Sequence, residues 1–210
     1  MPLVQEITDT EELISGAKRD IISSENKSIN LEIKSMLSSK TFKVFSSQDI
    51  QGVELAGALK NIYAICCGIA HAKLVGENAL GFIVTRSMAE MSRFAVAKGA
   101  NPITFLGLAG MGDLMATCTS KLSRNFQLGE LIAEDLSLID AKEKVGQVAE
   151  GTRTVEVVYH EANKMNVSMP LVNSLYKILY SDSSSDQLIQ DLLDHPNEVD
   201  VEFTYQGKKL

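Results

Sequence analysis

The most apolar stretch of the chain, 53-VELAGALKNIYAICCGIAHA-72, carries a lysine in its middle. At helical spacing Lys60 has small neighbours, Gly57, Cys67 and Gly68, and lies off the leucine and isoleucine stripe. Because each glycine in a helix costs about 1 kcal/mol relative to alanine, this side suggests close approach of another backbone or of a ligand. An ammonium there is a candidate for proton transfer. A solvated lysine beside tightly packed helices explains the pattern equally well.

A second candidate is 107-GLAGMGDLMATCTSKLSRN-125, in which three glycines precede Asp113. We interpret it as a site built on loops. Its end, Ser123-Arg124-Asn125, combines a helix-capping hydroxyl, a forked cation and an amide where a helix begins. Free N–H groups and the helix dipole favour an anion there, so a phosphate would fit. A capped helix with a surface arginine is the alternative.

The third candidate is 146-GQVAEGTRT-154, where two glycines bracket Val148 and Glu150 before a helix. Taken alone, this is the pattern of an ordinary loop with a helix cap. No Gly-x-Gly-x-x-Gly or Walker pattern occurs in the chain, so a complete dinucleotide-binding fingerprint is absent.

The cysteines and histidines predict neither a metal site nor a disulfide framework, because none has ligand spacing. These residues are Cys66, Cys67, Cys118, His71, His160 and His195. We therefore expect reduced thiols and no metal. The first 20 residues are acidic and lack an apolar core segment, so no secretory signal is visible and the expected location is the cytoplasm.

Composition excludes several classes of protein. The chain has 210 residues, of which 45% are hydrophobic, enough for one substantial core or for a domain plus a fragment. A net charge of −7 argues against broad electrostatic binding of nucleic acid. The longest apolar run, residues 62–72, is well short of the roughly 20 residues that span a bilayer, so we expect a core helix and no membrane span.

The elements that must position these residues divide the chain into three parts. Residues 1–50 contain a strand at 20–23, a helix at 28–37 and a strand at 41–45, a partial βαβ unit that lacks neighbouring strands. Residues 51–195 are expected to form an all-helical domain. Its helices are predicted from about 54 to 72, 78–98, a short one at 102, from 113, and at 124–133, 138–144, 152–165, 170–180 and 185–193. In the tail, 196–210, residues 199–205 alternate between apolar and polar side chains. This pattern fits an edge strand and a disordered segment equally well.

In order and spacing, five segments together resemble the C-terminal domain of NAD(P)-dependent glycerol-3-phosphate dehydrogenase. They are 52-GVELAGALKNIYAICCGIA-70, 85-TRSMAEMSR-93, 107-GLAGMGDLMATCTSKLSRN-125, 146-GQVAEGTRT-154 and 169-MPLVNSLYKILY-180. Residues 23–54 resemble the last helix and strand of that family's nucleotide-binding domain. The expected fold is therefore mainly α, of the 6-phosphogluconate dehydrogenase C-terminal type, preceded by a remnant of a Rossmann domain.

The resemblance implies a role for each site residue. Lys60 matches the family's general acid/base, whose ammonium polarises the ketone oxygen as hydride arrives, and Asn61 and Asp113 match neighbours that fix the lysine and the substrate. Further matches to substrate contacts are Thr117, Ser123, Arg124 and Asn125. Arg124, Val148 and Glu150 match positions that touch NAD or NADP. The substrate pair would be glycerol 3-phosphate and dihydroxyacetone phosphate.

The chain departs from the family pattern in three ways. It contains no Rossmann glycine loop and no upstream family lysine, and Ser87 stands where glycine is usual. Two alternatives to an active dehydrogenase follow: an inactive helical dimerisation or interaction module, and a related enzyme of the 6-phosphogluconate type, which the Ser-Arg-Asn triplet disfavours. A homodimer is possible. The choice between NAD and NADP depends on the absent domain.

Overall fold

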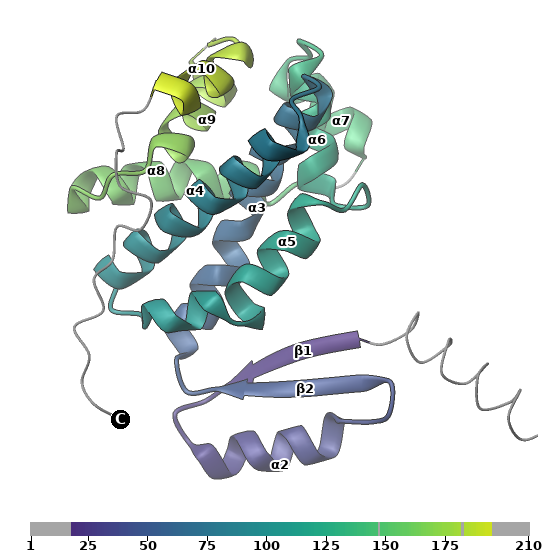
Figure 1. Ribbon diagram of the computed structural model, residues 1–210, viewed down its shortest axis with the longest axis vertical. Coiled ribbons are helices and arrows are strands. Elements are labelled where there is room, and N and C mark those ends of the chain that lie inside the picture. The colour runs from purple at the N-terminus through teal and green to yellow at the C-terminus, as the bar shows by residue number, and fades with distance from the viewer. Residues whose placement is uncertain (1–17, 147, 182, 195–210) are drawn as a thin grey trace, which may run out of the picture.

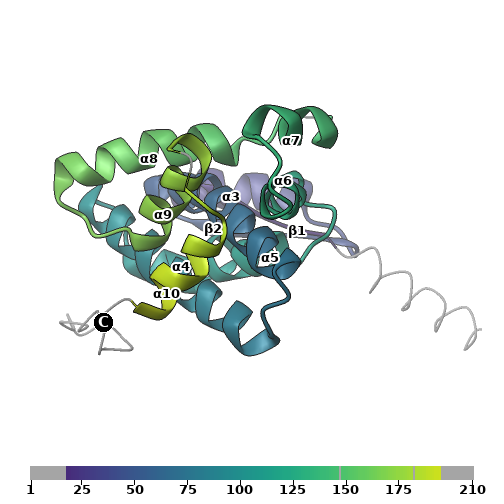
Figure 2. The same ribbon diagram turned by 90° about the horizontal axis from the view of Figure 1, so that it is seen from above.

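The computed structural model describes residues 18–146, 148–181 and 183–194 (Figure 1). A small α/β unit lies at one end of a larger body of helices, as Figure 1 shows; in Figure 2, seen from above, this unit lies behind the helices. The elements are β1 (Lys18–Ser23), α2 (Lys27–Leu37), β2 (Phe42–Ser47), α3 (Ile50–Ala72), α4 (Glu77–Ala97), η1 (Pro102–Leu106), η2 (Leu108–Gly112), α5 (Asp113–Cys118), α6 (Arg124–Ala133), α7 (Leu138–Val145), α8 (Gly151–Met165), α9 (Pro170–Tyr180) and α10 (Asp186–Asp194).

The α/β unit consists of two parallel strands joined through α2. β1 pairs with β2 in a register that places Lys18 opposite Phe42 and Ser23 opposite Ser47. The side-chain amide of Asn30 in α2 donates to the backbone carbonyls of Ser24 and Ser47, each at 2.9 Å, and so ties the helix to the ends of both strands. The predicted strand, helix and strand are therefore present, with each strand two residues longer at one end than predicted.

The core of the helical body is α3, whose residues from Ile62 to Ala70 are all buried. The helix begins at Ile50, four residues before the predicted start, because the Asp49 side chain caps it by accepting from the Gly52 N–H at 3.0 Å. By length and composition α3 also qualifies as a membrane span, but most of the qualifying stretch is buried inside the fold. It is a core helix, as predicted.

Two glycines allow α6 to lie directly against α3. A β-carbon added at Gly68 would lie 2.0 Å from the carbonyl oxygen of Phe126, and one at Gly129 would lie 2.1 Å from that of Ile65. Gly57 differs, because nothing lies within 4 Å of the position of its missing side chain. The expectation of close backbone approach is therefore confirmed at Gly68 but not at Gly57.

The predicted glycine loop before Asp113 is a helical turn. Residues Leu108–Gly112 form a π-helical turn that continues directly into α5. Gly110 is pressed against the backbone of Phe105, where a β-carbon would lie 2.1 Å from the carbonyl oxygen. The prediction of a loop was wrong because this segment is helical and Gly110 serves close packing within it. Such π turns are frequent at functional sites.

A buried carboxyl group on α4 caps α9. Glu90 accepts from the backbone N–H groups of Leu171 at 2.6 Å and Val172 at 3.3 Å, and from the Tyr63 hydroxyl at 3.2 Å. Burial raises the pKa of Glu90 to about 7, against the lowering effect of these hydrogen bonds and of Arg93. Ser87, where the family usually has glycine, is fully buried and donates to the Ile83 carbonyl, which agrees with a packing role.

The remaining predicted helices occur within one residue of their expected limits. α6 and α9 have the predicted bounds, because Ser123 caps one and Pro170 opens the other. The predicted strand at 199–205 lies outside the described residues, as does the whole of the proposed tail, 196–210. The limits of the three proposed domains stay a prediction.

We predict opposite effects of alanine at the two glycines of α3. Gly68→Ala should lower the free energy of unfolding by about 1–3 kcal/mol, because its methyl group overlaps the Phe126 backbone. Gly57→Ala, the matched control, should be neutral or stabilise by about 0.5–1 kcal/mol, because alanine is the better helix former. Urea unfolding of both variants measures the difference, and equal effects would contradict the packing described here.

We also predict a pH dependence of stability from Glu90. Its pKa is raised in the folded state from 4.5 to about 7, so the folded chain holds a proton that the unfolded chain releases between these values. This contribution is fully present below about pH 4.5 and is lost as the pH rises through 7. Glu90→Gln should remove this loss, on the order of 2–3 kcal/mol.

The measurement is urea unfolding at several pH values between 5 and 8. The exposed Glu54 on α3 provides a control, because Glu54→Gln should leave the pH dependence unchanged. If the free energy of unfolding fell with pH equally steeply in wild type and in Glu90→Gln, the loss of stability would not come from Glu90.

Candidate active site

The centre of the candidate site is an ion pair between α3 and α5. Lys60 Nζ lies 2.5 Å from Asp113 Oδ2, although the two residues are 53 positions apart in sequence. The side chains are 22% and 39% exposed, so the pair lies at the surface of the core and not within it. Asp113 reaches this position because the π turn ends one residue before it and α5 begins there. The ammonium is therefore both held and accessible.

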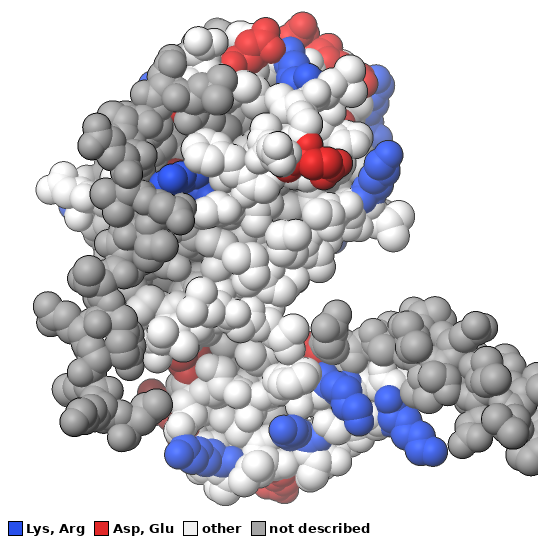
Figure 3. All heavy atoms as spheres, viewed as in Figure 1, with Lys and Arg blue, Asp and Glu red and all other residues white. Residues whose placement is uncertain are grey.

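A pocket of about 350 Å³ adjoins Asp113. It is lined from β1 by Asp20 and Ile21, and from η2 and α5 by Leu108, Ala109, Gly112, Asp113 and Ala116. The space-filling view shows the surface hollowed between the helical body and the α/β unit (Figure 3). The aspartate of the pair thus lines a cavity large enough for a small molecule, while Lys60 reaches the site through its contact with Asp113.

Thr117 lies one turn beyond Asp113 on α5. Its hydroxyl donates to the Asp113 carbonyl oxygen at 2.6 Å, so its hydrogen is used within the helix. The oxygen retains acceptor capacity toward a ligand.

Asn61, Asn125 and Gly151 form a hydrogen-bonded series that joins three helices. Asn125 Nδ2 donates to Asn61 Oδ1 at 3.1 Å, and Asn125 Oδ1 accepts from the Gly151 N–H at 3.0 Å. The sequence singled out both asparagines but gave no sign that they touch, since they lie 64 residues apart. Gly151 was not predicted as a site residue; the only local signal is its place between Glu150 and a helix start.

The start of α6 has the geometry of an anion site. Ser123 is the N-cap and accepts from the Phe126 N–H at 3.4 Å, and Arg124, the first residue of the helix, is exposed. The first N–H groups of a helix have no partner within it, and the helix dipole adds partial positive charge. Arg124 and these N–H groups can therefore hold a phosphate together.

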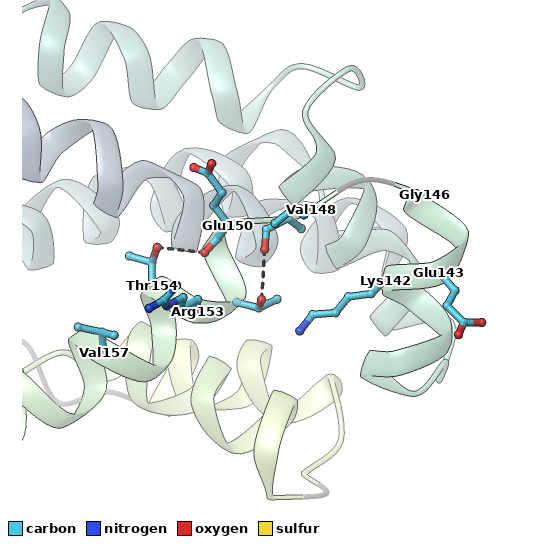
Figure 4. A pocket seen from close by; sticks show the side chains of 10 residues that line it. Lys142, Glu143, Gly146, Val148, Glu150, Arg153, Thr154 and Val157 are labelled. Carbon is cyan, nitrogen blue, oxygen red and sulfur yellow. Dashed lines mark hydrogen bonds between the residues drawn. The ribbon is translucent and has the colours of Figure 1, made fainter.

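Val148 and Glu150 border a different pocket. This cavity has a volume of about 1040 Å³ and lies between α7 and the start of α8. Figure 4 shows Lys142 reaching toward it from α7. The Val148 side chain is 75% exposed, and the Glu150 carboxylate points away from Lys142 and Arg153. The cavity is larger than the one at Asp113 but lies apart from the lysine–aspartate pair, so its size does not make it the reaction site.

The fold and site together define a class of protein. A helical body that surrounds one buried helix, with a lysine–aspartate pair at its surface and a phosphate-type helix start nearby, has the form of the C-terminal domain of a dehydrogenase. Within the residues that the structure describes, no cluster of histidine, cysteine or acidic side chains could hold a metal.

Comparison with known proteins identifies the family. Residues 49–190 match the model of the NAD-dependent glycerol-3-phosphate dehydrogenase C-terminus, and the chain belongs to this family. The glycerol-3-phosphate dehydrogenase [NAD(P)+] of Alcanivorax borkumensis is 49% identical over 183 residues, and that of Pseudomonas aeruginosa is 46% identical. These matches cover 87% of this chain and 53–54% of the relatives.

Solved structures agree with this assignment. The glycerol-3-phosphate dehydrogenase of Coxiella burnetii superposes with a TM-score of 0.82 at 34% identity, covering 87% of this chain and 57% of that one. The enzyme of Saccharomyces cerevisiae superposes with a TM-score of 0.70 at 27% identity, covering 76% and 47% of the two chains. The present chain thus spans about half the length of the curated relatives that it matches, and the 6-phosphogluconate type is not favoured.

Proposed function

We propose that this protein interconverts glycerol 3-phosphate and dihydroxyacetone phosphate by hydride transfer with NAD(H) or NADP(H), and that Lys60 is the general acid/base. The observation that carries the proposal is the ion pair of Lys60 with Asp113, 2.5 Å long, beside a small cavity. Membership of the family and the names of the relatives support it.

Lys60 would donate its proton to the ketone oxygen in the reductive direction and accept the hydroxyl proton in the reverse direction. Asp113 would hold the ammonium in place, because it shares one of the lysine's hydrogens. Asn61 and Thr117 would contact the substrate oxygens next to Lys60 and Asp113. The ammonium would also stabilise the negative charge that develops on that oxygen.

Arg124 and the helix start after Ser123 would bind the substrate phosphate. Asn125 belongs to the same segment, but its side-chain oxygen and one side-chain N–H are engaged by Gly151 and Asn61. Its share of phosphate binding would come from its backbone N–H or from the remaining side-chain hydrogen.

The residues proposed to touch NAD or NADP fit that role. Val148 offers an exposed apolar surface, Glu150 an outward carboxylate, and Arg124 an exposed cation. When bound, the cofactor supplies or accepts the hydride. The chain's own residues would orient the dinucleotide against the Lys60 side of the site, and the pyrophosphate-binding glycine loop would have to come from a nucleotide-binding domain. The cytoplasm and a homodimer remain our proposals for location and assembly.

We predict that Arg124→Ala weakens binding of glycerol 3-phosphate about 10- to 100-fold and leaves the melting temperature almost unchanged. Loss of a charge-assisted contact to phosphate costs about 1.5–3 kcal/mol, whereas an exposed side chain contributes little to folding. Titration of the 210-residue chain, followed by NMR, measures the affinity.

The matched control is Arg153→Ala, because Arg153 is exposed at the start of α8 and takes no part in the proposed phosphate site. Equal affinity of wild type and Arg124→Ala would show that Ser123 to Asn125 do not bind the phosphate. Glycerol, which lacks the phosphate, should bind both forms equally weakly.

We further predict that Lys60→Met lowers turnover 10²- to 10⁴-fold, the usual loss when a general acid/base is removed. Stability should change by no more than about 1 kcal/mol, because a partly exposed ion pair contributes little. The assay follows NADH or NADPH oxidation by dihydroxyacetone phosphate, using this chain joined to the nucleotide-binding domain of the Alcanivorax borkumensis relative.

The chain without that domain should give background rates, since it lacks the glycine loop that positions the dinucleotide. A Lys60→Met enzyme within a few-fold of the wild-type rate would mean that Lys60 is a packing lysine. Turnover by the 210-residue chain alone would contradict the proposed need for the additional domain.

A further inference from the structure

Gly151 stands at the end of the hydrogen-bonded series through the two asparagines, and its backbone can only donate there. Its N–H lies 3.0 Å from Asn125 Oδ1. As the first residue of α8, Gly151 has an N–H with no partner inside its own helix. The Asn125 side chain therefore satisfies a group that the helix leaves open.

This single donor determines the orientation of both side-chain amides. Because the Gly151 N–H requires an acceptor, Asn125 must turn its oxygen toward it and its nitrogen toward Asn61. Asn61 must then meet Asn125 with its oxygen, and its own Nδ2 remains available as a donor. Among the residues that the structure describes, Asn61 Nδ2 has no hydrogen-bond partner.

Gly151 also leaves no room for a side chain. A β-carbon there would lie 2.6 Å from the carbonyl oxygen of Asn61, 2.7 Å from Asn125 Oδ1 and 2.9 Å from the Ile65 side chain. Two of the three obstacles belong to Asn61 and Asn125, through the backbone carbonyl of the first and the side-chain oxygen of the second. Any larger residue would push Asn61 or Asn125 from its position.

We infer that Gly151 is a positioning residue, whose N–H fixes both asparagine amides so that Asn61 offers a hydrogen-bond donor to a substrate oxygen. The inference rests on the proposed function, because it adds a residue to the same site. Gly151 also directly follows Glu150, so the loop proposed to touch the cofactor is joined by hydrogen bonds to the helix that carries Lys60.

Hydrogen exchange of the Gly151 amide in the 210-residue chain, without a ligand, tests the hydrogen bond from Gly151 to Asn125. In wild type this amide should exchange slowly, although the first N–H of a helix is normally open. Asn125→Leu should accelerate its exchange at least 10-fold. Asn125→Asp, which keeps an acceptor oxygen, and Arg153→Ala, the control on the same helix turn, should leave it slow.

The NMR resonance of the Asn61 side-chain NH₂ group tests whether this group is a donor to the substrate. It should shift when glycerol 3-phosphate is added to wild type. In Asn125→Asp a carboxylate oxygen replaces the NH₂ group that faces Asn61. The Asn61 side-chain amide should therefore flip and donate to this carboxylate. Its NH₂ resonance should then no longer shift when the ligand is added. The variants are compared at equal occupancy, judged from the Arg124 backbone amide.

Rapid exchange of the wild-type Gly151 amide, or exchange that Asn125→Leu does not change, would overturn the inference. An unresponsive Asn61 NH₂ group in saturated wild type would overturn it as well. A protected Gly151 amide in a chain that does not bind glycerol 3-phosphate would support the amide series and contradict the proposed function. Should Asn125→Leu not fold, Asn125→Ser, which shortens the side chain, replaces it.

Discussion

The backbone contact between α3 and α6 is the constraint on which the rest of the structure depends. At Gly68 and Gly129 each helix leaves no room for even a β-carbon on the other, so the two axes lie as close as backbones permit. This contact covers one side of the buried stretch of α3 and determines where the start of α6 lies relative to α3. The position of Ser123 and Arg124 relative to Lys60 therefore follows from two residues that carry no side chain.

Helix starts gather at the polar part of α3. α5 begins with Asp113, which pairs with Lys60; α6 begins beside Asn125, which bonds to Asn61; and α8 begins with Gly151, which bonds to Asn125. The starts of α6 and α8 add partial positive charge. Free N–H donors are to be expected at the start of α6, because α5 continues the π turn before it and the Gly151 N–H is bound to Asn125. A phosphorylated anion is the kind of ligand that such an arrangement favours, in a chain whose net charge of −7 would otherwise repel it.

The surroundings of each carboxylate in this fold determine whether it stabilises the packing of helices or belongs to the candidate site. Asp49 accepts from Gly52, from the Asn101 N–H and from the Thr104 hydroxyl, and so joins the start of α3 to η1. These hydrogen bonds outweigh burial and lower the pKa of Asp49. Glu90 is fully enclosed, and there burial prevails. Asp113 is partly exposed, as Asp49 is, but differs from both in being paired with an ammonium that a substrate could reach.

The sequence by itself determined those features that local interactions control. The limits of α6 and α9 followed from Ser123 and Pro170, since a capping hydroxyl and a ring without an N–H act within one helical turn. The placement of Lys60 on a side of α3 with small neighbours was visible from helical spacing alone. The order and spacing of five segments were sufficient to indicate the family.

Three features were decided only by the tertiary structure. They are which of two similar glycines packs against a backbone, the helical conformation of the glycines before Asp113, and the hydrogen bond of Gly151 to Asn125. Gly57 and Gly68 look alike in sequence, but one faces open space and the other a backbone. Glu90 likewise shows no sign in its neighbours that it will cap a helix 81 residues away. The physical reason is the same in each case: the partner comes from a distant part of the chain, and its approach depends on how whole helices pack.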